Sequence, residues 1–290
     1  MEENTLQNYS LKELRARYEE QRQGKESLLV LIDEAEIPES VYNSNAIENS
    51  TLTLLDTEKI LLDMEVSRNL SLREVFEAKN LAQVTEYLRP THGKKEFSLE
   101  LILLLHKMLI SNIEDGIAGR LRGPGEYVRV GKYIAPAPEQ LQSLMTAAVT
   151  KYNSNVDLSP LVNIVRFHLE FEHIHPFCDG NGRIGRILIN FQLQNAGFPP
   201  VILRNKEKQK YYEAIKMYDD KEIHSPMLKV FTKAMRESLH KRLAYLEGKK
   251  IMKLSEFAKI NELGIHTLLN AAKRQTIPAF RERGTWKIGV

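Results

Sequence analysis

The sequence predicts a mainly helical protein with short β-hairpins, and two observations lead to this fold class. Apolar residues recur at helical spacing along most of the chain, whereas the strand-like stretches, residues 127–134 and 277–288, are short and contain a glycine. Hydrophobic residues make up 42% of the 290 positions, enough for a buried core in a chain about as long as two average domains. No apolar run approaches the roughly 18–20 residues that cross a bilayer, so no membrane partner is expected.

The predicted helices follow from apolar periodicity and from residues that begin or end helices. A long, charged helix is expected over residues 11–34, and Pro38 is expected to open a second helix because proline is favoured in a first turn. Ser98 is a candidate N-cap. Further helices are predicted at residues 55–64, 72–88, 99–110, 139–152, 158–174, 183–193, 207–218 and 224–245. Gly123-Pro124-Gly125 then breaks the pattern before a hairpin that turns near Gly131.

One short stretch gathers most of the chemically active side chains. It reads His175-Pro176-Phe177-Cys178-Asp179-Gly180-Asn181-Gly182-Arg183-Ile184-Gly185-Arg186. Glycine lets backbone N–H groups turn toward a ligand, so Gly180-Asn181-Gly182 is interpreted as an anion-binding nest. A helix follows, and Gly197 is its expected C-terminal cap. The nest therefore lies at a helix N-terminus, where free N–H groups and the helix dipole favour phosphate.

The side chains of this stretch suit displacement at a phosphate. His175 titrates near neutrality and can take a proton from an attacking hydroxyl. Asp179 is a lone carboxylate of the kind that Mg²⁺ uses together with phosphate oxygens. Asn181 and the nest amides can hold one phosphate, while Arg183 and Arg186, three residues apart, can hold its neighbours. These are the parts that an in-line displacement on a nucleotide requires.

Some residues in and near this stretch are expected to have structural roles or no chemical role. Phe177 is expected to anchor the loop in the core, and no chemistry is assigned to Cys178. Zinc bound by His168, His173, His175 and Cys178 is disfavoured, because the spacing matches no familiar site and leaves the glycines unexplained. The single cysteine and an acidic N-terminus without a signal pattern lead us to expect a cytoplasmic location.

The stretch matches the Fic-domain signature, His-x-Phe-x-Asp/Glu-Gly-Asn-Gly-Arg-x-x-Arg, at every specified position. The resemblance covers about residues 40–235. It implies a Fic-fold helical bundle that transfers AMP from ATP to a Ser, Thr or Tyr hydroxyl of a protein, the chain itself included, and releases pyrophosphate. It also implies Mg²⁺ as the cofactor.

The resemblance assigns a role to each motif residue. His175 would be the base, Asp179 the Mg²⁺ ligand and Asn181 an α-phosphate contact. Arg183 would hold the β-phosphate region and Arg186 the γ-phosphate, with Gly180 and Gly182 completing the nucleotide-binding loop.

Two further segments resemble functional parts of the family. The hairpin resembles the flap that pairs with a target segment, and its docking residues would be Val128, Arg129, Val130, Gly131, Lys132, Tyr133 and Ile134. Tyr211-Tyr212 resembles a tyrosine pair near the nucleotide base, with Tyr212 as the expected contact. Many relatives carry Asn near the position of Asp219, and this departure weakens the assignment of ATP as the donor.

An upstream segment resembles the inhibitory helix of the family, Ser/Thr-x-x-x-Glu-Gly/Asn. It comprises Ser44, Glu48 and Asn49 in a helix expected at about residues 39–49. Ser44 and Glu48 are four apart and share one helix face. A glutamate presented there is expected to pair with Arg186 and to take the place of the ATP γ-phosphate.

The end of the chain is basic. Residues 241–290 hold eleven Lys/Arg and four Asp/Glu, a net of +7 that leaves −4 for residues 1–240. Residues 254–274 predict helix, glycine turn and helix, and residues 277–288 a hairpin, so the end resembles a winged helix-turn-helix domain. Such domains bind DNA, dock other proteins or form dimers, so DNA and a homodimer both stay open as partners.

The sequence thus predicts three parts and leaves two classes of function open. The parts are an N-terminal helical region over 1–95, a Fic core over 96–240 and the winged-helix-like domain over 249–290. The leading hypothesis is a self-inhibited protein adenylyltransferase. The alternative is a DNA-binding regulator whose Fic core senses a ligand or is vestigial. Within the enzyme class, another phosphate-containing donor, or removal of AMP at the same site, also stays open.

Overall fold

The computed structural model describes residues 6–7, 9–65, 70–89, 95–155 and 157–290, and it confirms a mainly helical fold. Two compact units make up these parts of the chain. The larger unit comprises residues 37–197 and 203–230, and the smaller unit residues 1–36, 198–202 and 231–290. Within the described residues, no helix combines the length and the apolar character needed to cross a membrane.

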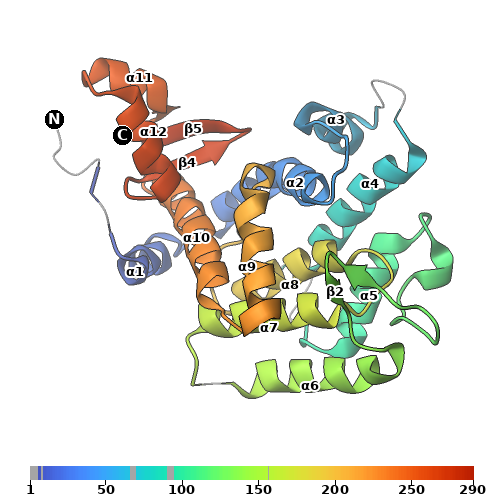
Figure 1. Ribbon diagram of the computed structural model, residues 1–290. Coiled ribbons are helices and arrows are strands. Elements are labelled where there is room, and N and C mark those ends of the chain that lie inside the picture. The colour runs from blue at the N-terminus through green and yellow to red at the C-terminus, as the bar shows by residue number, and fades with distance from the viewer. Residues whose placement is uncertain (1–5, 8, 66–69, 90–94, 156) are drawn as a thin grey trace. The chain divides into compact units, whose positions relative to one another are not determined.

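The larger unit contains most of the helices (Figure 1). They are the end of α2 (Glu26–Ile47), α3 (Leu54–Glu58) with a π-helix at Lys59–Asp63, α4 (Leu72–Tyr87), α5 (Leu99–Ile110), α6 (Leu141–Ser154), α7 (Pro160–Ile174), α8 (Asn181–Asn195), α9 (Lys208–Lys221) and the start of α10 (Ser225–Leu246). Short 3₁₀ turns lie at Asp115–Ile117, Pro138–Gln140 and Asn205–Glu207. Ser98 caps α5 as predicted, because its hydroxyl accepts a hydrogen bond from the Leu101 N–H at 3.2 Å.

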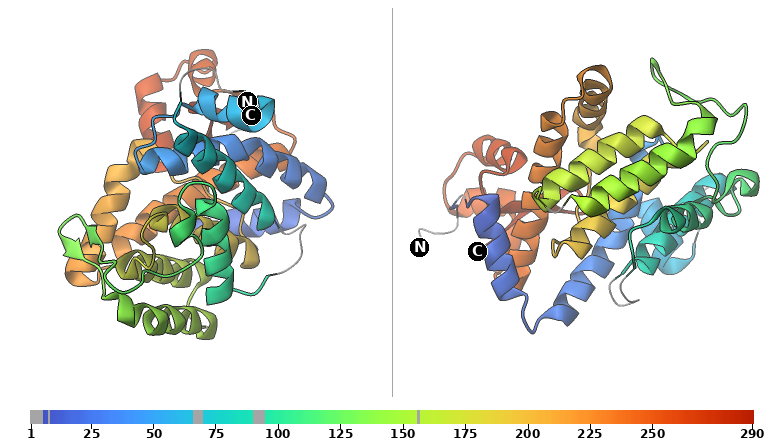
Figure 2. Two further views of the ribbon diagram at one scale, coloured as in Figure 1. Left: turned by 90° about the vertical axis from the view of Figure 1, so that its right-hand side faces the viewer. Right: turned by 90° about the horizontal axis from the view of Figure 1, so that it is seen from below.

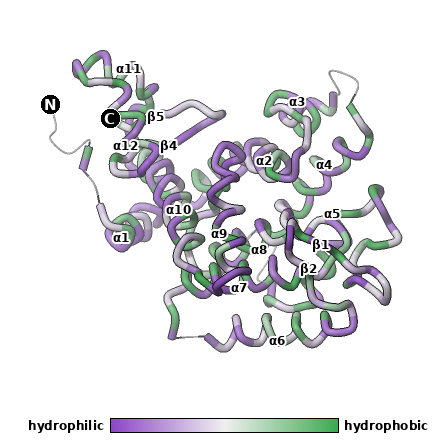
Figure 3. The backbone as a smooth tube through the Cα atoms, in the orientation of Figure 1, coloured by the Kyte–Doolittle hydropathy of each residue, from purple (hydrophilic) through white to green (hydrophobic). Residues whose placement is uncertain are grey.

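The core of the larger unit forms around α5, α7 and α8. Phe171 of α7, Ile184 of α8 and Leu105 of α5 are fully buried in one cluster. Helices α6 and α7 run side by side (Figure 2), and α7 packs on α8. Hydrophobic and hydrophilic residues alternate along most helices (Figure 3), as expected when one helix face meets the core and the other meets water. This packing holds the loop between α7 and α8 on a rigid support.

Two helix predictions near the N-terminus were wrong. Residues 11–34 form two helices, because α1 (Leu11–Gln21) ends before Gly24, which has φ +69° and turns the chain into α2. Pro38 opens no helix and lies inside α2. Its lack of an N–H removes one helical hydrogen bond, yet buried neighbours such as Val41 and Ile47 keep the helix in place by packing. The segment predicted to be inhibitory comprises the last part of α2 and the turn that follows it, where Glu48 precedes Asn49, at φ +68°.

The smaller unit holds α1, the end of α10 and the C-terminal elements β3 (Ile251–Lys253), α11 (Leu254–Ile260), α12 (Ile265–Arg274), β4 (Ala279–Glu282) and β5 (Thr285–Gly289). The three strands form an antiparallel sheet in the order β3-β5-β4. Leu254, Phe257 and Ile288 belong to its core cluster. The two helices and the hairpin occur where they were predicted, and β3 was not predicted. The winged helix-turn-helix assignment and the three-part division of the chain stay predictions.

Candidate active site

The loop between α7 and α8 begins at His175. This residue ends α7 in the left-handed region at φ +48°, and its N–H donates to the Phe171 carbonyl at 2.9 Å. Arg122 holds it from outside the helix, since its Nε donates to the His175 carbonyl at 2.9 Å. The imidazole Nδ1 lies 3.3 Å from the Glu172 carbonyl, an oxygen that can only accept. Nδ1 therefore carries the proton in neutral His175, and Nε2 has the free electron pair of a base.

Electrostatics favour the neutral base. Burial lowers the pKa of His175, and the hydrogen bond to the Glu172 carbonyl opposes this only in part. The imidazole is consequently neutral at physiological pH and available to take a proton.

The inside of the loop is held by Asn181 and His106. The Phe177 N–H donates to the Asn181 Oδ1 at 2.9 Å, and the Asn181 Nδ2 donates to the Phe177 carbonyl at 2.8 Å. Phe177 is fully buried, as predicted, and stacks on His106 with ring centroids 3.7 Å apart. His106 accepts at Nδ1 from the Gly119 N–H, so its Nε2 donates to the Asp179 carbonyl at 3.0 Å. The side chain of Asn181, predicted to contact the α-phosphate, here fixes the shape of the loop.

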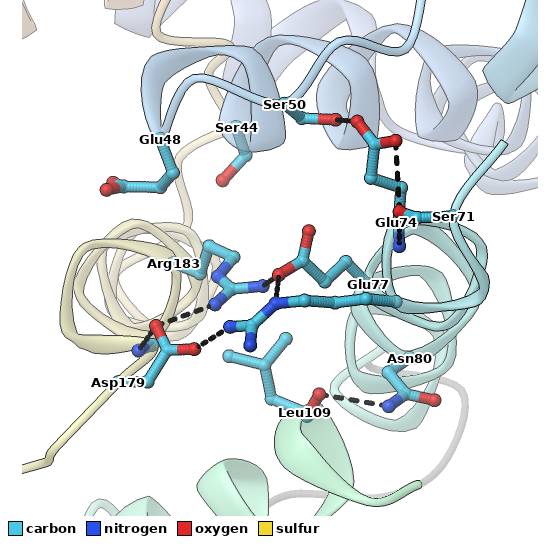
Figure 4. Close-up of polar contacts among 12 residues, drawn as sticks. Ser44, Glu48, Ser50, Ser71, Glu74, Glu77, Asn80, Leu109, Asp179 and Arg183 are labelled. Carbon is cyan, nitrogen blue, oxygen red and sulfur yellow. Dashed lines mark hydrogen bonds and ion pairs between the residues drawn. The ribbon is translucent and has the colours of Figure 1, made fainter. Parts of the chain in front are cut away.

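Asp179 has a different set of partners on each carboxylate oxygen (Figure 4). Its Oδ1 accepts from the Gly180 N–H at 2.6 Å and from Arg183 at 3.0 Å, both within the loop and the first turn of α8. Its Oδ2 pairs with Arg73 of α4. Glu77, also on α4, lies 3.1 Å from both Arg73 and Arg183 and joins the two cations. Burial raises the pKa of Asp179, but Arg183, the Gly180 N–H and Arg73 outweigh it, so the pKa is below its usual value.

A divalent cation is chemically compatible with Asp179. Mg²⁺ takes one or two carboxylates together with phosphate oxygens and water. Over the part of the chain that the structure describes, no group of three or more His, Cys, Asp or Glu side chains could hold a metal by itself. Asp179 could therefore hold such a cation together with the oxygens of a bound phosphate.

Arg186 is held by the end of α2. It lies 2.9 Å from the Glu48 carboxylate and donates to both the hydroxyl and the carbonyl of Ser44, each at 2.9 Å. Gly182 permits this approach, because a Cβ at that position would lie 2.2 Å from the Glu48 carboxylate. The structure therefore brings Ser44, Glu48 and Arg186 together.

Other residues fix the end of α2 over the loop. Tyr212 donates from its hydroxyl to the Ile47 carbonyl at 2.8 Å, and Lys208 donates to the Asn49 side chain at 3.0 Å. Tyr212 was predicted to contact a nucleotide base, and in this structure its hydroxyl instead contacts the backbone just before Glu48. Helix α9 therefore contacts the residues just before and just after Glu48.

Three buried polar residues, Glu172, Tyr211 and His168, lie near Arg186. Burial raises the pKa of Glu172 to about 8, although Arg186 lies close enough to oppose this. The Tyr211 hydroxyl lies 2.9 Å from the His168 Nε2 and 3.4 Å from Glu172. A Cβ on Gly185 would come within 2.5 Å of the Glu172 carboxyl, so glycine makes room for it. Burial thus favours the neutral form of Glu172, whereas the Glu48 carboxylate lies 2.9 Å from Arg186.

The site also contains residues that the sequence did not single out: Arg73, Glu77, His106, Arg122 and Glu172. Each comes from another helix or loop, or from a helix face that looks like ordinary core. Only the fold brings them to the loop.

The geometry defines a mainly helical protein in which a glycine-containing loop leads into the N-terminus of α8, with a neutral histidine before the loop and two buried arginines after it. Residues 96–193 match the Fic/DOC family model, so this part of the chain is a domain of that family.

Similar proteins agree with this family. A protein adenylyltransferase Fic from Nematostella vectensis is 32% identical over 208 residues, which is 70% of this chain and 48% of the relative. The chain thus spans about half the length of that relative. A fragment of Fic-1 from C. elegans has 26% identity and a TM-score of 0.70, covering 80% of this chain and 70% of that one. A Fic-domain signaling protein from Bacteroides thetaiotaomicron, at 24% identity, shares the fold with a TM-score of 0.75 over 83% of this chain and 97% of that one.

Proposed function

We propose that this chain is a self-inhibited protein adenylyltransferase that moves AMP from ATP to a Ser, Thr or Tyr hydroxyl of a protein, the chain itself included. The observation that carries the proposal is the loop at residues 175–186, where a neutral His175 precedes a helix N-terminus that bears two buried arginines. The name of the 32% identical relatives, protein adenylyltransferase Fic, supports the same reaction class.

The residues divide the work of in-line displacement. Nε2 of His175 takes the proton of the acceptor hydroxyl. The oxygen of that hydroxyl bonds to the α-phosphorus of ATP while the bond from the α-phosphorus to pyrophosphate breaks, and pyrophosphate leaves. The α8 N-terminus, Arg183 and Arg186 hold the phosphates. Asp179 would hold Mg²⁺, which when bound neutralises phosphate charge. Arg183 can contact a phosphate only if it breaks its ion pair with Glu77. Likewise, Asp179 can hold Mg²⁺ only if it breaks its ion pair with Arg73.

Inhibition follows from the contact between Glu48 and Arg186. A carboxylate 2.9 Å from the guanidinium takes the place that a γ-phosphate would need. ATP without that contact would sit with its α-phosphate misaligned for attack. We therefore assign Glu48, with Ser44 and Asn49, to an inhibitory segment. A cytoplasmic location and a homodimer stay predictions.

The transferred group can be identified with two labels. The Glu48→Gly protein is incubated with Mg²⁺ and ATP labelled either in the adenine or in the γ-phosphate, and mass spectrometry locates the product. Adenine label is expected on a hydroxyl side chain, with the γ label in released pyrophosphate. Protein-bound γ label would instead indicate a phosphate transferase. Loss of adenine label from a previously modified protein would indicate removal of AMP.

A second function, DNA binding by residues 249–290, is favoured by the exposed surface of this end. Lys253, Lys259, Lys273, Arg274 and Arg283 are all exposed. Lys273 and Arg274 belong to the last turn of α12, the second helix of the helix-turn-helix pattern. A basic surface of this kind also suits docking to an acidic protein. DNA binding and protein docking therefore have to be distinguished by experiment.

Salt dependence provides that test. If these residues bind DNA, the affinity for a fluorescent duplex is expected to fall steeply with salt, with a log–log slope of about −0.9 per phosphate contact. Lys273→Gln with Arg274→Gln is expected to reduce that slope by about two contacts while AMP transfer is unchanged. Absence of duplex binding by the whole chain at low salt would leave protein docking as the role of this end, and would remove the DNA-binding regulator as an alternative.

A further inference from the structure

We propose that His173 is a positioning residue that fixes the flap, residues 128–134, and so sets where an acceptor segment lies relative to His175. The proposal rests on the proposed function, because it concerns how a protein hydroxyl reaches the base. It assigns a role to three residues that the transfer chemistry itself does not use: Tyr133, His173 and Asp219.

The three side chains form one directed chain of hydrogen bonds. The His173 Nδ1 lies 2.8 Å from the Asp219 Oδ1, and its Nε2 lies 2.8 Å from the Tyr133 hydroxyl. A carboxylate only accepts, so His173 donates from Nδ1 to Asp219, and its Nε2 shares the second hydrogen bond with the Tyr133 hydroxyl. The rings of Tyr133 and His173 also stack, with centroids 4.4 Å apart and an interplanar angle of 28°. We call this arrangement the flap clamp.

The clamp joins three separate elements. Tyr133 lies in β2 (Tyr133–Ile134) of the flap, His173 in the last turn of α7, and Asp219 near the end of α9. Tyr218, the neighbour of Asp219, packs its ring edge-on against His173 at 5.8 Å. His173 thus lies between α9 and the flap, with its side chain 34% exposed, two residues before His175.

The flap is too small to fix its own position. Its strands β1 (Arg129–Val130) and β2 pair over only two positions, Arg129 with Ile134 and Val130 with Tyr133. A two-stranded hairpin is marginally stable at best without packing against other elements. Ile134 is 66% exposed, and Gly131 and Lys132 at the turn are exposed as well. The flap therefore depends on contacts from outside the hairpin.

Two contacts supply this support at different points. Arg122 holds the base of the flap, because its guanidinium donates to the carbonyls of Glu126 and Pro136, each at 2.9 Å, and also to the carbonyl of His175. The clamp holds the strand itself through Tyr133. Without the clamp, the two ends of the flap would stay attached to Arg122 next to His175. The flap strands themselves could then move relative to these ends.

This position decides how an acceptor is presented. Both flap strands are edge strands in a two-stranded sheet, so an extended acceptor segment can pair with the free edge through main-chain hydrogen bonds. The hydroxyl of that segment must meet Nε2 of His175, and a misplacement of about 1 Å can cost ~10²-fold in rate. Because His173 and His175 share one helix end, the clamp ties the docking edge directly to the base.

Hydrogen–deuterium exchange tests the clamp without relying on activity. Tyr133→Phe keeps the stacked ring and removes the hydroxyl. Exchange of flap amides is expected to rise roughly 3- to 10-fold, the range expected for loss of one hydrogen bond of typical net strength. Asp219→Asn and Asp219→Leu form a matched pair, since Asn keeps an oxygen that accepts from His173 and Leu does not. Only Asp219→Leu is expected to increase exchange. Tyr152→Phe, in α6 of the same unit, is the control.

Kinetics then test the consequence for docking. Each variant is combined with Glu48→Gly, and an inactive His175→Ala copy of the chain serves as the acceptor. Tyr133→Phe and Asp219→Leu are expected to raise the KM for that acceptor, and Tyr133→Phe is expected to leave the KM for ATP unchanged. Unchanged flap exchange in both variants, or a change in the ATP KM alone, would overturn the proposal. If the clamp-intact protein transfers no AMP at all, the proposed function fails, while the exchange data still decide whether the clamp holds the flap.

Discussion

Replacing Glu48 by glycine is expected to raise AMP transfer by ~10²-fold or more, because the α-phosphate is then free to align for attack. In the structure, the Glu48 carboxylate lies 2.9 Å from Arg186, which also donates to the Ser44 hydroxyl. The variant removes only the carboxylate arm, and the guanidinium keeps its hydrogen bonds to Ser44 and becomes available to a γ-phosphate. The measurement is initial-rate transfer of labelled AMP at saturating ATP and Mg²⁺.

Two controls separate the charge from the helix. Glu39→Gly, in the helix that precedes Glu48, removes a carboxylate that pairs with Arg204 rather than Arg186, and it also places a glycine in this segment. It is expected to leave transfer low. Glu48→Gln keeps the length of the side chain and removes the charge, and it is expected to give an intermediate rate.

A double-mutant cycle tests whether Glu48 and Arg186 act as a unit. Arg186→Ala removes the phosphate contact together with the partner of Glu48, so it is not expected to activate. The double variant is expected to resemble Arg186→Ala alone, since two residues that share one interaction give non-additive effects. Additive effects, or an unchanged rate in Glu48→Gly, would mean that the contact does not restrain transfer.

The parts of the site that could be predicted from the sequence are the residues that lie close together in one continuous segment of the chain. The spacing of His175, Asp179 and Arg186, the glycines between them and the helix that follows define the loop without any knowledge of the fold. Ser44 and Glu48 could be associated with this loop only through resemblance to a family, because nothing in residues 44–48 alone points to Arg186, which lies far along the chain.

The remaining parts could not be predicted, because they depend on contacts between segments that are distant in sequence. Arg73 and Glu77 look like an ordinary i, i+4 ion pair on a helix surface, yet they contact Asp179 and Arg183. His106 occupies an apolar face of α5 and resembles any core histidine. Asn181 and Tyr212 carry polar groups that either a ligand or the backbone can satisfy, and here the backbone satisfies them.

Backbone rules failed where packing opposed them. Pro38 is a good residue for a first helical turn, but it lies inside α2 because the buried residues around it favour a continuous helix. His175 is a poor residue for φ +48°, yet it adopts this conformation because the Phe171 and Arg122 hydrogen bonds fix the backbone there. Local propensity therefore predicted most helices but not the backbone at Pro38 and His175.

Replacing His175 by alanine is expected to reduce AMP transfer by ~10²–10⁴-fold, the usual contribution of a general base, and to leave nucleotide affinity nearly unchanged. The imidazole acts on the acceptor hydroxyl, while the phosphates depend on the α8 N-terminus and the arginines. Both quantities are measured in the Glu48→Gly background, by transfer of labelled AMP and by calorimetric titration with ATP. Cys178→Ala, in the same loop but without assigned chemistry, is the matched control and is expected to retain transfer.

The pH profile gives an independent test of the same residue. Burial lowers the pKa of His175 below the ordinary value of about 6.5, so the neutral, basic form persists at neutral pH and is lost only as the pH falls through the lowered pKa. Transfer by the Glu48→Gly protein is therefore expected to be flat near pH 7 and to decline on the acid side, at a pH below that of a free histidine. The residual transfer of the His175→Ala protein is expected to lack this acid limb. Full transfer by the His175→Ala protein, or an acid limb that survives the substitution, would assign the base to another group.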